Sequence, residues 1–135
     1  MRQVRRASVL ILCVIMTACA GGYPGEQAFR RGEHRLAAEQ GYPEAQWLLG
    51  DAYARGLGVE PDLEAAVRWY RAAAERGHAR AGYELGLAFQ QGRGIPRSML
   101  EAARWFRTAA EAGDPDAQFE FGKLCFEGRW VRFNP

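Results

Sequence analysis

The chain has 135 residues, 48% of them hydrophobic, with 18 basic and 16 acidic side chains. This length is enough for one domain with a core of its own. Three of the basic residues, Arg2, Arg5 and Arg6, lie near the N-terminus, which leaves 15 basic against 16 acidic residues in the rest of the chain. A nearly neutral domain lacks the basic footprint of nucleic-acid binding, so we expect no nucleic-acid partner.

The first 18 residues have the pattern of a signal peptide. An apolar run at 7–16 follows the arginines and is too short to cross a bilayer, which needs about 20 apolar residues. The next feature, Met16-Thr17-Ala18-Cys19, resembles a bacterial lipobox and implies a lipid on Cys19. The alternative is cleavage after Ala20, at Ala18-Cys19-Ala20, which would release a soluble periplasmic or secreted protein.

The lipobox resemblance also predicts a location. Ala20 directly after the cysteine resembles a signal for the outer membrane, so we expect a protein of the bacterial cell envelope, anchored by lipid at the periplasmic face of that membrane. Residues 19–27 form a short linker, which reaches about 30 Å when extended. The domain that follows is therefore expected to work close to the bilayer.

From residue 28 to residue 128 the sequence repeats itself with a period of 36. Residues 45–80 and 81–116 are identical at 14 of 36 positions, and a partial third copy occupies 117–128. Such a period is typical of stacked supersecondary units, none of which can bury its apolar face alone.

Each copy carries the signals of two helices. Pro43 suits the first turn of a helix, and Gly56 suits a left-handed C-cap. Asp62 is predicted to start the second helix of one copy. Ser98 starts that of the next copy, with Glu101 completing a capping box. Each copy is thus predicted to be a helix hairpin.

Three glycines, Gly50, Gly86 and Gly122, fall inside the first helix of their copies. Glycine costs about 1 kcal/mol there relative to alanine, so its recurrence indicates that a neighbouring helix approaches closely. We expect the ring of Trp69 or Trp105 to cover the space left by the missing side chain.

The repeated residues resemble the Sel1-like repeats, a tetratricopeptide-like family. The match is carried by Glu44-Ala45-Gln46-Trp47-Leu48-Leu49-Gly50, Gly56-Leu57-Gly58-Val59, Asp62, Ala65-Ala66, Trp69-Tyr70, Ala73-Ala74 and Gly77-His78-Ala79. The resemblance implies an all-α fold, a short right-handed α-solenoid of about six helices. It weakens at both ends, where Glu33 replaces a tryptophan and Trp130 a loop glycine, which predicts terminal caps and a C-terminal tail at 129–135.

No catalytic constellation is apparent. The two histidines, His34 and His78, stand apart, and metal-ligand clusters, phosphate loops and nucleophile elbows are missing from the sequence. We therefore expect no enzyme activity, no metal and no cofactor. Cys125 stands where Tyr53 and Phe89 stand in the other copies, which predicts a small buried hydrophobic residue.

Binding residues are sought where the copies differ. In arrays of this family the first helix of each pair lines the concave face, so its variable positions are candidates for partner choice. These positions are Leu48, Glu84 and Glu120; Asp51, Leu87 and Lys123; and Arg55, Gln91 and Glu127. An aromatic row, Trp47, Tyr83 and Phe119, could also grip a ligand, although core packing is the favoured interpretation.

The family's usual role implies a non-enzymatic, envelope-anchored adaptor or scaffold whose helical-repeat groove holds an unidentified protein partner. The alternative is a protein that binds or modifies cell-wall material such as peptidoglycan or another glycan.

Overall fold

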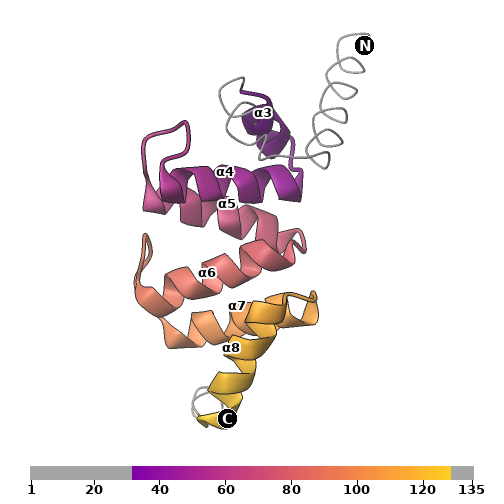
Figure 1. Ribbon diagram of the computed structural model, residues 1–135, viewed down its shortest axis with the longest axis vertical. Helices are drawn as coiled ribbons and strands as arrows, with labels where there is room; N and C mark the ends of the chain where they lie inside the picture. The colour runs from indigo at the N-terminus through magenta and orange to yellow at the C-terminus, as the bar shows by residue number, and fades with distance from the viewer. Residues whose placement is uncertain (1–31, 129–135) are drawn as a thin grey trace.

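The computed structural model describes residues 32–128, which form one stack of α-helices. The helices are α3 (Glu33–Glu39), α4 (Pro43–Arg55), α5 (Leu63–Glu75), α6 (Ala79–Gln91), α7 (Met99–Glu111) and α8 (Pro115–Phe126). Figure 1 shows α3 and α8 at opposite ends of the stack. These six helices, with no strand within residues 32–128, confirm the predicted all-α helical-repeat fold.

Some predicted features lie outside the described residues, namely the signal peptide at 1–18, the linker at 19–27 with Cys19, and the tail at 129–135. Between residues 32 and 128, no helix combines the length and the apolar character needed to cross a membrane.

The helices start and end where local signals place them. Asp62 accepts a hydrogen bond from the Ala65 amide at 3.0 Å, and Gly56 ends α4 with φ of 69°. Ser98 caps α7 by accepting from the Glu101 amide at 3.3 Å. The second half of the expected capping box does not form, because the Ser98 amide donates to the Phe89 carbonyl instead.

The bare helix glycines lie against aromatic rings, but the rings are not those of the tryptophans. A Cβ on Gly50 would lie 2.7 Å from the Tyr70 ring, and one on Gly86 would lie 2.6 Å from the Phe106 ring. The expectation for Trp69 and Trp105 was wrong, because the residue after each tryptophan is the one that points at the preceding helix. In a helix, one residue further along means a rotation of about 100°.

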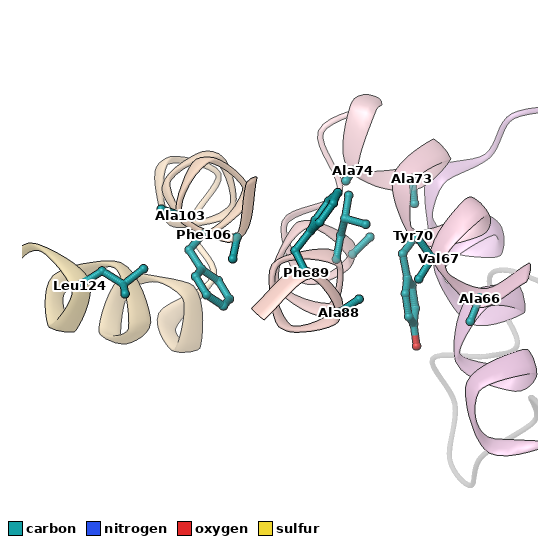
Figure 2. Close-up of a cluster of buried hydrophobic side chains, with 13 residues drawn as sticks. Ala66, Val67, Tyr70, Ala73, Ala74, Ala88, Phe89, Ala103, Phe106 and Leu124 are labelled. Carbon is teal, nitrogen blue, oxygen red and sulfur yellow. The ribbon is translucent and has the colours of Figure 1, made fainter. Parts of the chain in front are cut away.

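The core runs through the stack as two clusters. The larger one joins α5, α6, α7 and α8 through Tyr70, Phe89, Phe106 and Leu124, together with a series of alanines, and Figure 2 shows it. The smaller one packs α3 on α4 through Ala37, Ala38, Ala45 and Leu49. Alanine dominates both clusters because small side chains let successive helices approach closely.

The last helix, α8, has a different environment. A Cβ on Gly122 would meet nothing within 4 Å, and Cys125 is exposed. The prediction of a buried Cys125 was wrong, because the position that α5 or α7 covers in earlier copies has no second helix over it among the described residues. The large side chains Phe119 and Phe126 are 70% and 94% exposed on the same helix.

Candidate functional site

A pocket of about 120 Å³ opens where α4, α5 and α6 meet, at the junction between two repeats. We call it the junction pocket. It is lined by Ala54, Leu63, Ala66, Val67, Tyr70, Glu84, Leu87, Ala88, Gln91 and Arg93. Three of these residues, Glu84, Leu87 and Gln91, are among the variable first-helix positions selected from the sequence. They lie on one face of α6 because their spacings of three, four and seven residues place them there.

Tyr70 brings a hydroxyl group to the lining of this pocket. The residue is only 6% exposed, and its ring covers Gly50 of α4. Among the described residues, no group forms a hydrogen bond with the Tyr70 hydroxyl. Burial, together with the nearby carboxylates of Glu84 and Asp51, raises its pKa above the ordinary value. The phenol therefore stays protonated at neutral pH and can both donate and accept a hydrogen bond.

Glu84 adds a carboxylate whose side chain is 25% exposed. Burial raises its pKa, and Asp51 and Asp114 add to this effect, while Arg80 and Arg55 oppose it. The Arg80 guanidinium lies 3.3 Å from the Glu84 carboxylate. The fold thus holds this acid where its charged form is less favourable than in water.

Arginines partly balance the acidic groups around the pocket. Arg55 pairs with Asp51 at 2.9 Å, and Arg80 lies 2.6 Å from Asp116. The Arg80 guanidinium also lies 4.5 Å from the centre of the Tyr83 ring. The variable residues Asp51 and Arg55 therefore contribute to the electrostatics of the junction pocket without being part of its lining.

The remaining variable positions lie elsewhere. Leu48 is half-buried on α4. On α8, Lys123 and Glu120 form an ion pair at 2.8 Å, and Glu127 is the exposed C-cap residue. The structure therefore gathers the candidates of the first two copies, apart from Leu48, in or near one pocket. Those of the third copy lie on the last helix and its C-cap.

The aromatic row does not act as one surface. The Trp47 ring stacks on the His78 ring with centroids 5.4 Å apart, and Tyr83 lies against Phe106 at 5.9 Å. Trp47 and Tyr83 are partly buried against the larger core cluster, whereas Phe119 is exposed. The three aromatic residues occupy the same position of the repeat, but two pack against the core and the third is exposed to solvent.

His78 has a structural position between repeats. Its Nδ1 atom accepts a hydrogen bond from the Ala81 amide at 3.1 Å and so caps α6. Its Nε2 atom lies 2.7 Å from a carboxylate oxygen of Glu44, in the first turn of α4. This hydrogen bond lowers the pKa of Glu44. Among residues 32–128 there is no group of three or more His, Cys, Asp or Glu residues that could hold a metal ion.

Sequence reasoning missed Tyr70 as a site residue. In the sequence Tyr70 stands out only as part of the repeated motif Trp69-Tyr70. The signal was the hydroxyl itself, because Phe106 performs the same packing role without it. Arg93 was also missed, since it lies in the loop after α6 and outside the helix face that was compared.

Comparison with known proteins agrees with this geometry. Residues 43–78 and 79–114 each match the sequence model of the Sel1 repeat. These two units share the 36-residue period and begin two residues before the alanine frame used above. No curated protein sequence matches the chain closely enough to count as a relative.

Three solved structures are similar. A Sel1 repeat protein from Oxalobacter formigenes is 39% identical, with a TM-score of 0.66 over 77% of this chain and 44% of that one. The protective antigen c5321 of uropathogenic Escherichia coli is 36% identical, with a TM-score of 0.70 over 76% and 25% of the two chains. Cysteine-rich protein B of Helicobacter pylori is 27% identical, with a TM-score of 0.61 over 63% and 64%.

The chain thus spans less than half the length of the first two of these proteins. Two consecutive matches to the repeat, the alternation of helix pairs and the covered helix glycines lead to one assignment. The chain belongs to the Sel1-repeat family.

Proposed function

We propose that this protein is a non-enzymatic adaptor that holds a segment of a partner protein in the junction pocket, while a lipid on Cys19 anchors it in the bacterial cell envelope. Sel1-repeat proteins generally mediate protein–protein interactions. The particular site, the anchor and the periplasmic face of the outer membrane are parts of this proposal.

The observation that carries the proposal is the hydroxyl of Tyr70, which has no hydrogen-bond partner among the described residues and lines the same pocket as the partly buried carboxylate of Glu84. Phe106 covers Gly86 with a ring alone, at 2.6 Å from the position of an added Cβ. The hydroxyl of Tyr70 is therefore not needed for packing, and it is available to form a hydrogen bond with a bound partner.

The lining of the pocket indicates which side chain would fit. Val67, Leu87 and Ala88 offer an apolar wall, and Glu84 offers a negative charge. A lysine side chain has an aliphatic stem that can lie along such a wall and an ammonium group with three donors. In the junction pocket that ammonium would donate to the Glu84 carboxylate and to the Tyr70 oxygen. We therefore propose a partner segment that presents a lysine.

The anchor rests on a separate observation, the sequence Met16-Thr17-Ala18-Cys19. Cells that express the protein are grown with radiolabelled palmitate. The label is expected in the wild-type protein and absent from Cys19→Ser. A label that persists in Cys19→Ser would refute the anchor and leave the pocket proposal standing.

The pocket is tested by crosslinking and pull-down from native membranes. We expect the wild-type protein to capture a stoichiometric protein partner, and Tyr70→Phe and Glu84→Gln each to reduce that capture at least tenfold. Tyr70→Phe keeps the ring over Gly50, so its melting temperature is expected to stay within about 2 °C of wild type. The matched control is Glu75→Gln, on the exposed surface of α5 away from the pocket.

Undiminished capture by both pocket variants would contradict the proposal. Retention of the protein on purified peptidoglycan, without a captured protein, would instead support cell-wall binding.

A further inference from the structure

The junction pocket has a counterpart one repeat further along the chain, where α8 packs on α7. We call this place the second junction. Phe106 of α7 and Leu124 of α8 lie there in the same buried cluster (Figure 2). Phe106 covers Gly86 in the same way as Tyr70 covers Gly50. The two junctions can therefore be compared residue by residue.

Both junctions contain an acidic residue at the same repeat position, but three of its neighbours differ. The equivalent pairs, 36 residues apart, are Tyr70 and Phe106, Glu84 and Glu120, Leu87 and Lys123, and Ala88 and Leu124. The first member of each pair lines the junction pocket. The second junction thus keeps the carboxylate and changes what surrounds it.

Lys123 brings an ammonium group to the carboxylate of the second junction. Its Nζ atom lies 2.8 Å from the Glu120 carboxylate, three residues earlier on the same helix. The Glu120 side chain is 16% exposed, and its Oε2 atom is buried. Lys123 itself is exposed on α8, so its long stem reaches from the surface to a carboxylate that solvent barely contacts.

The apolar floor of the second junction is filled as well. Leu124 is 2% exposed and belongs to the larger core cluster. Ala88, at the equivalent position, lines the open pocket of the first junction. A leucine side chain fills space that an alanine leaves empty, so the first junction is open beside its carboxylate and the second is packed.

The cation nearest to Glu84 is shared with other acidic residues. The Arg80 guanidinium lies 3.3 Å from Glu84, but it also lies 2.6 Å from Asp116 and 3.6 Å from Asp114. Glu84 therefore competes with two aspartates for one guanidinium. A carboxylate accepts several hydrogen bonds, which leaves Glu84 able to bind a second cation.

We propose that the residue at position 87, like its equivalent at 123, decides whether a junction accepts a lysine from outside. Leu87 leaves Glu84 to the lysine of a partner, while Lys123 takes the place of such a lysine on Glu120. Of the two junctions, only the first then binds a partner's lysine. This inference rests on the proposed function of the junction pocket.

The first test uses N-acetyl-lysine methylamide, a probe that carries the ligand chemistry alone. NMR of protein labelled with isotope-enriched glutamate follows the side-chain carboxyl signals. In the wild type the probe should shift the signal of Glu84 and leave that of Glu120 in place. Equal responses of the two would overturn the inference. A wild type without a response at Glu84 would contradict the junction pocket itself and, with it, this inference.

Leu87→Lys should close the first junction, because it gives α6 the pair that α8 has. The affinity of the probe at Glu84 should fall by about tenfold or more. The matched control is Thr108→Lys, which adds the same charge on the exposed surface of α7 and should leave the response unchanged. An undiminished response of Glu84 in Leu87→Lys would overturn the inference while the pocket proposal stands.

A second readout of Leu87→Lys needs neither a probe nor a partner. The introduced amine should pair with Glu84, so its pKa should be higher than in the double variant Leu87→Lys/Glu84→Gln. NMR of the amine, methylated with an isotope label, measures both values. Equal pKa values would show that the amine does not reach Glu84 and would overturn the inference.

The converse experiment opens the second junction. Lys123→Leu/Leu124→Ala gives α8 the two residues of α6, so the probe should now shift the signal of Glu120. The single variant Leu124→Ala is the control, because it keeps Lys123 on Glu120 and should not respond. Equal behaviour of the two variants, with the circular dichroism of α8 retained, would overturn the role of Lys123. If α8 unfolds in both, the Leu87→Lys measurements decide.

Discussion

The helices α6 and α8 occupy the same place in their repeats, yet their glycine-bearing faces have opposite roles. On α6 the face around Gly86 is buried under α7, with Phe106 fully buried against it. On α8 the face around Gly122 is open, and Cys125 and Phe126 are exposed. Because the two helices follow one sequence pattern, the difference shows that the neighbouring helix decides whether this face belongs to the core or stays exposed.

The largest expected effect comes from the ring that covers α6. Phe106→Ala should destabilise the protein by about 3–5 kcal/mol, because it removes a fully buried ring and leaves a cavity over Gly86. Phe126→Ala, on the open helix, should change the free energy of unfolding by less than about 0.5 kcal/mol. Urea unfolding at low protein concentration measures both. Similar losses in the two variants would break the comparison between α6 and α8.

A second pair of glycines distinguishes the cost of a steric clash from the cost of a left-handed backbone conformation. Gly94, in the loop after α6, has φ of +74°, and a Cβ there would overlap the Leu63 carbonyl oxygen. Gly128, after α8, has φ of +66° with nothing within 4 Å.

Alanine at Gly128 should cost about 1 kcal/mol, from the left-handed conformation alone. At Gly94 the clash should add to this strain, for a total of about 2–4 kcal/mol. Thermal unfolding of the two variants tests this order, and an equal cost would show that the loop after α6 moves away from α5 without penalty.

The sequence predicted those parts of the fold that depend on local chemistry. The cap at Asp62 and the left-handed glycine at Gly56 depend on neighbouring backbone atoms, so the period of 36 was enough to place them. The choice between Trp69 and Tyr70 as the covering ring was not local. It depends on how the second helix is rotated against the first, and adjacent aromatic residues do not reveal that rotation.

Part of the candidate site could also be predicted from the sequence. Glu84, Leu87 and Gln91 line one pocket because variable positions of a repeat share a helix face. Tyr70 was not predicted as a site residue because its ring packs in the core and only its hydroxyl group belongs to the pocket. The exposure of Cys125 was beyond a comparison of copies, since the preceding copies have a covering helix at that position.

The smallest expected effect is a pH dependence of stability that comes from Glu84 on α6, the helix that α7 covers. The pKa of Glu84 is raised by burial, so its charged form destabilises the folded state above the unfolded pKa, which is near 4.3. This penalty is relieved as the pH falls through the raised folded pKa. Glu84→Gln should therefore stabilise the protein at pH 7 by about 0.5 kcal/mol, and the difference from wild type should vanish near pH 4.

Unfolding measured from pH 4 to pH 8 checks the sign of this effect. Glu44→Gln is the contrasting variant, because the hydrogen bond from His78 lowers the pKa of Glu44. When the pKa of a carboxylate is lower in the folded state, its ionised form stabilises the fold at pH values above the unfolded pKa. This stability is lost as the pH falls through the folded pKa. Glu44→Gln should thus lose stability at pH 7, and a loss in Glu84→Gln as well would show that the Arg80 pair outweighs burial.

The central claim is that a second helix, and not the glycine itself, determines the role of each first helix. The most direct measurement is the free energy of unfolding of Gly86→Ala and Gly122→Ala, compared under the same conditions. Gly86→Ala should lose about 1–3 kcal/mol, because its Cβ would overlap the buried Phe106 ring. Gly122→Ala should gain about 1 kcal/mol from helix propensity alone. Shifts of the same sign in both variants would contradict the account.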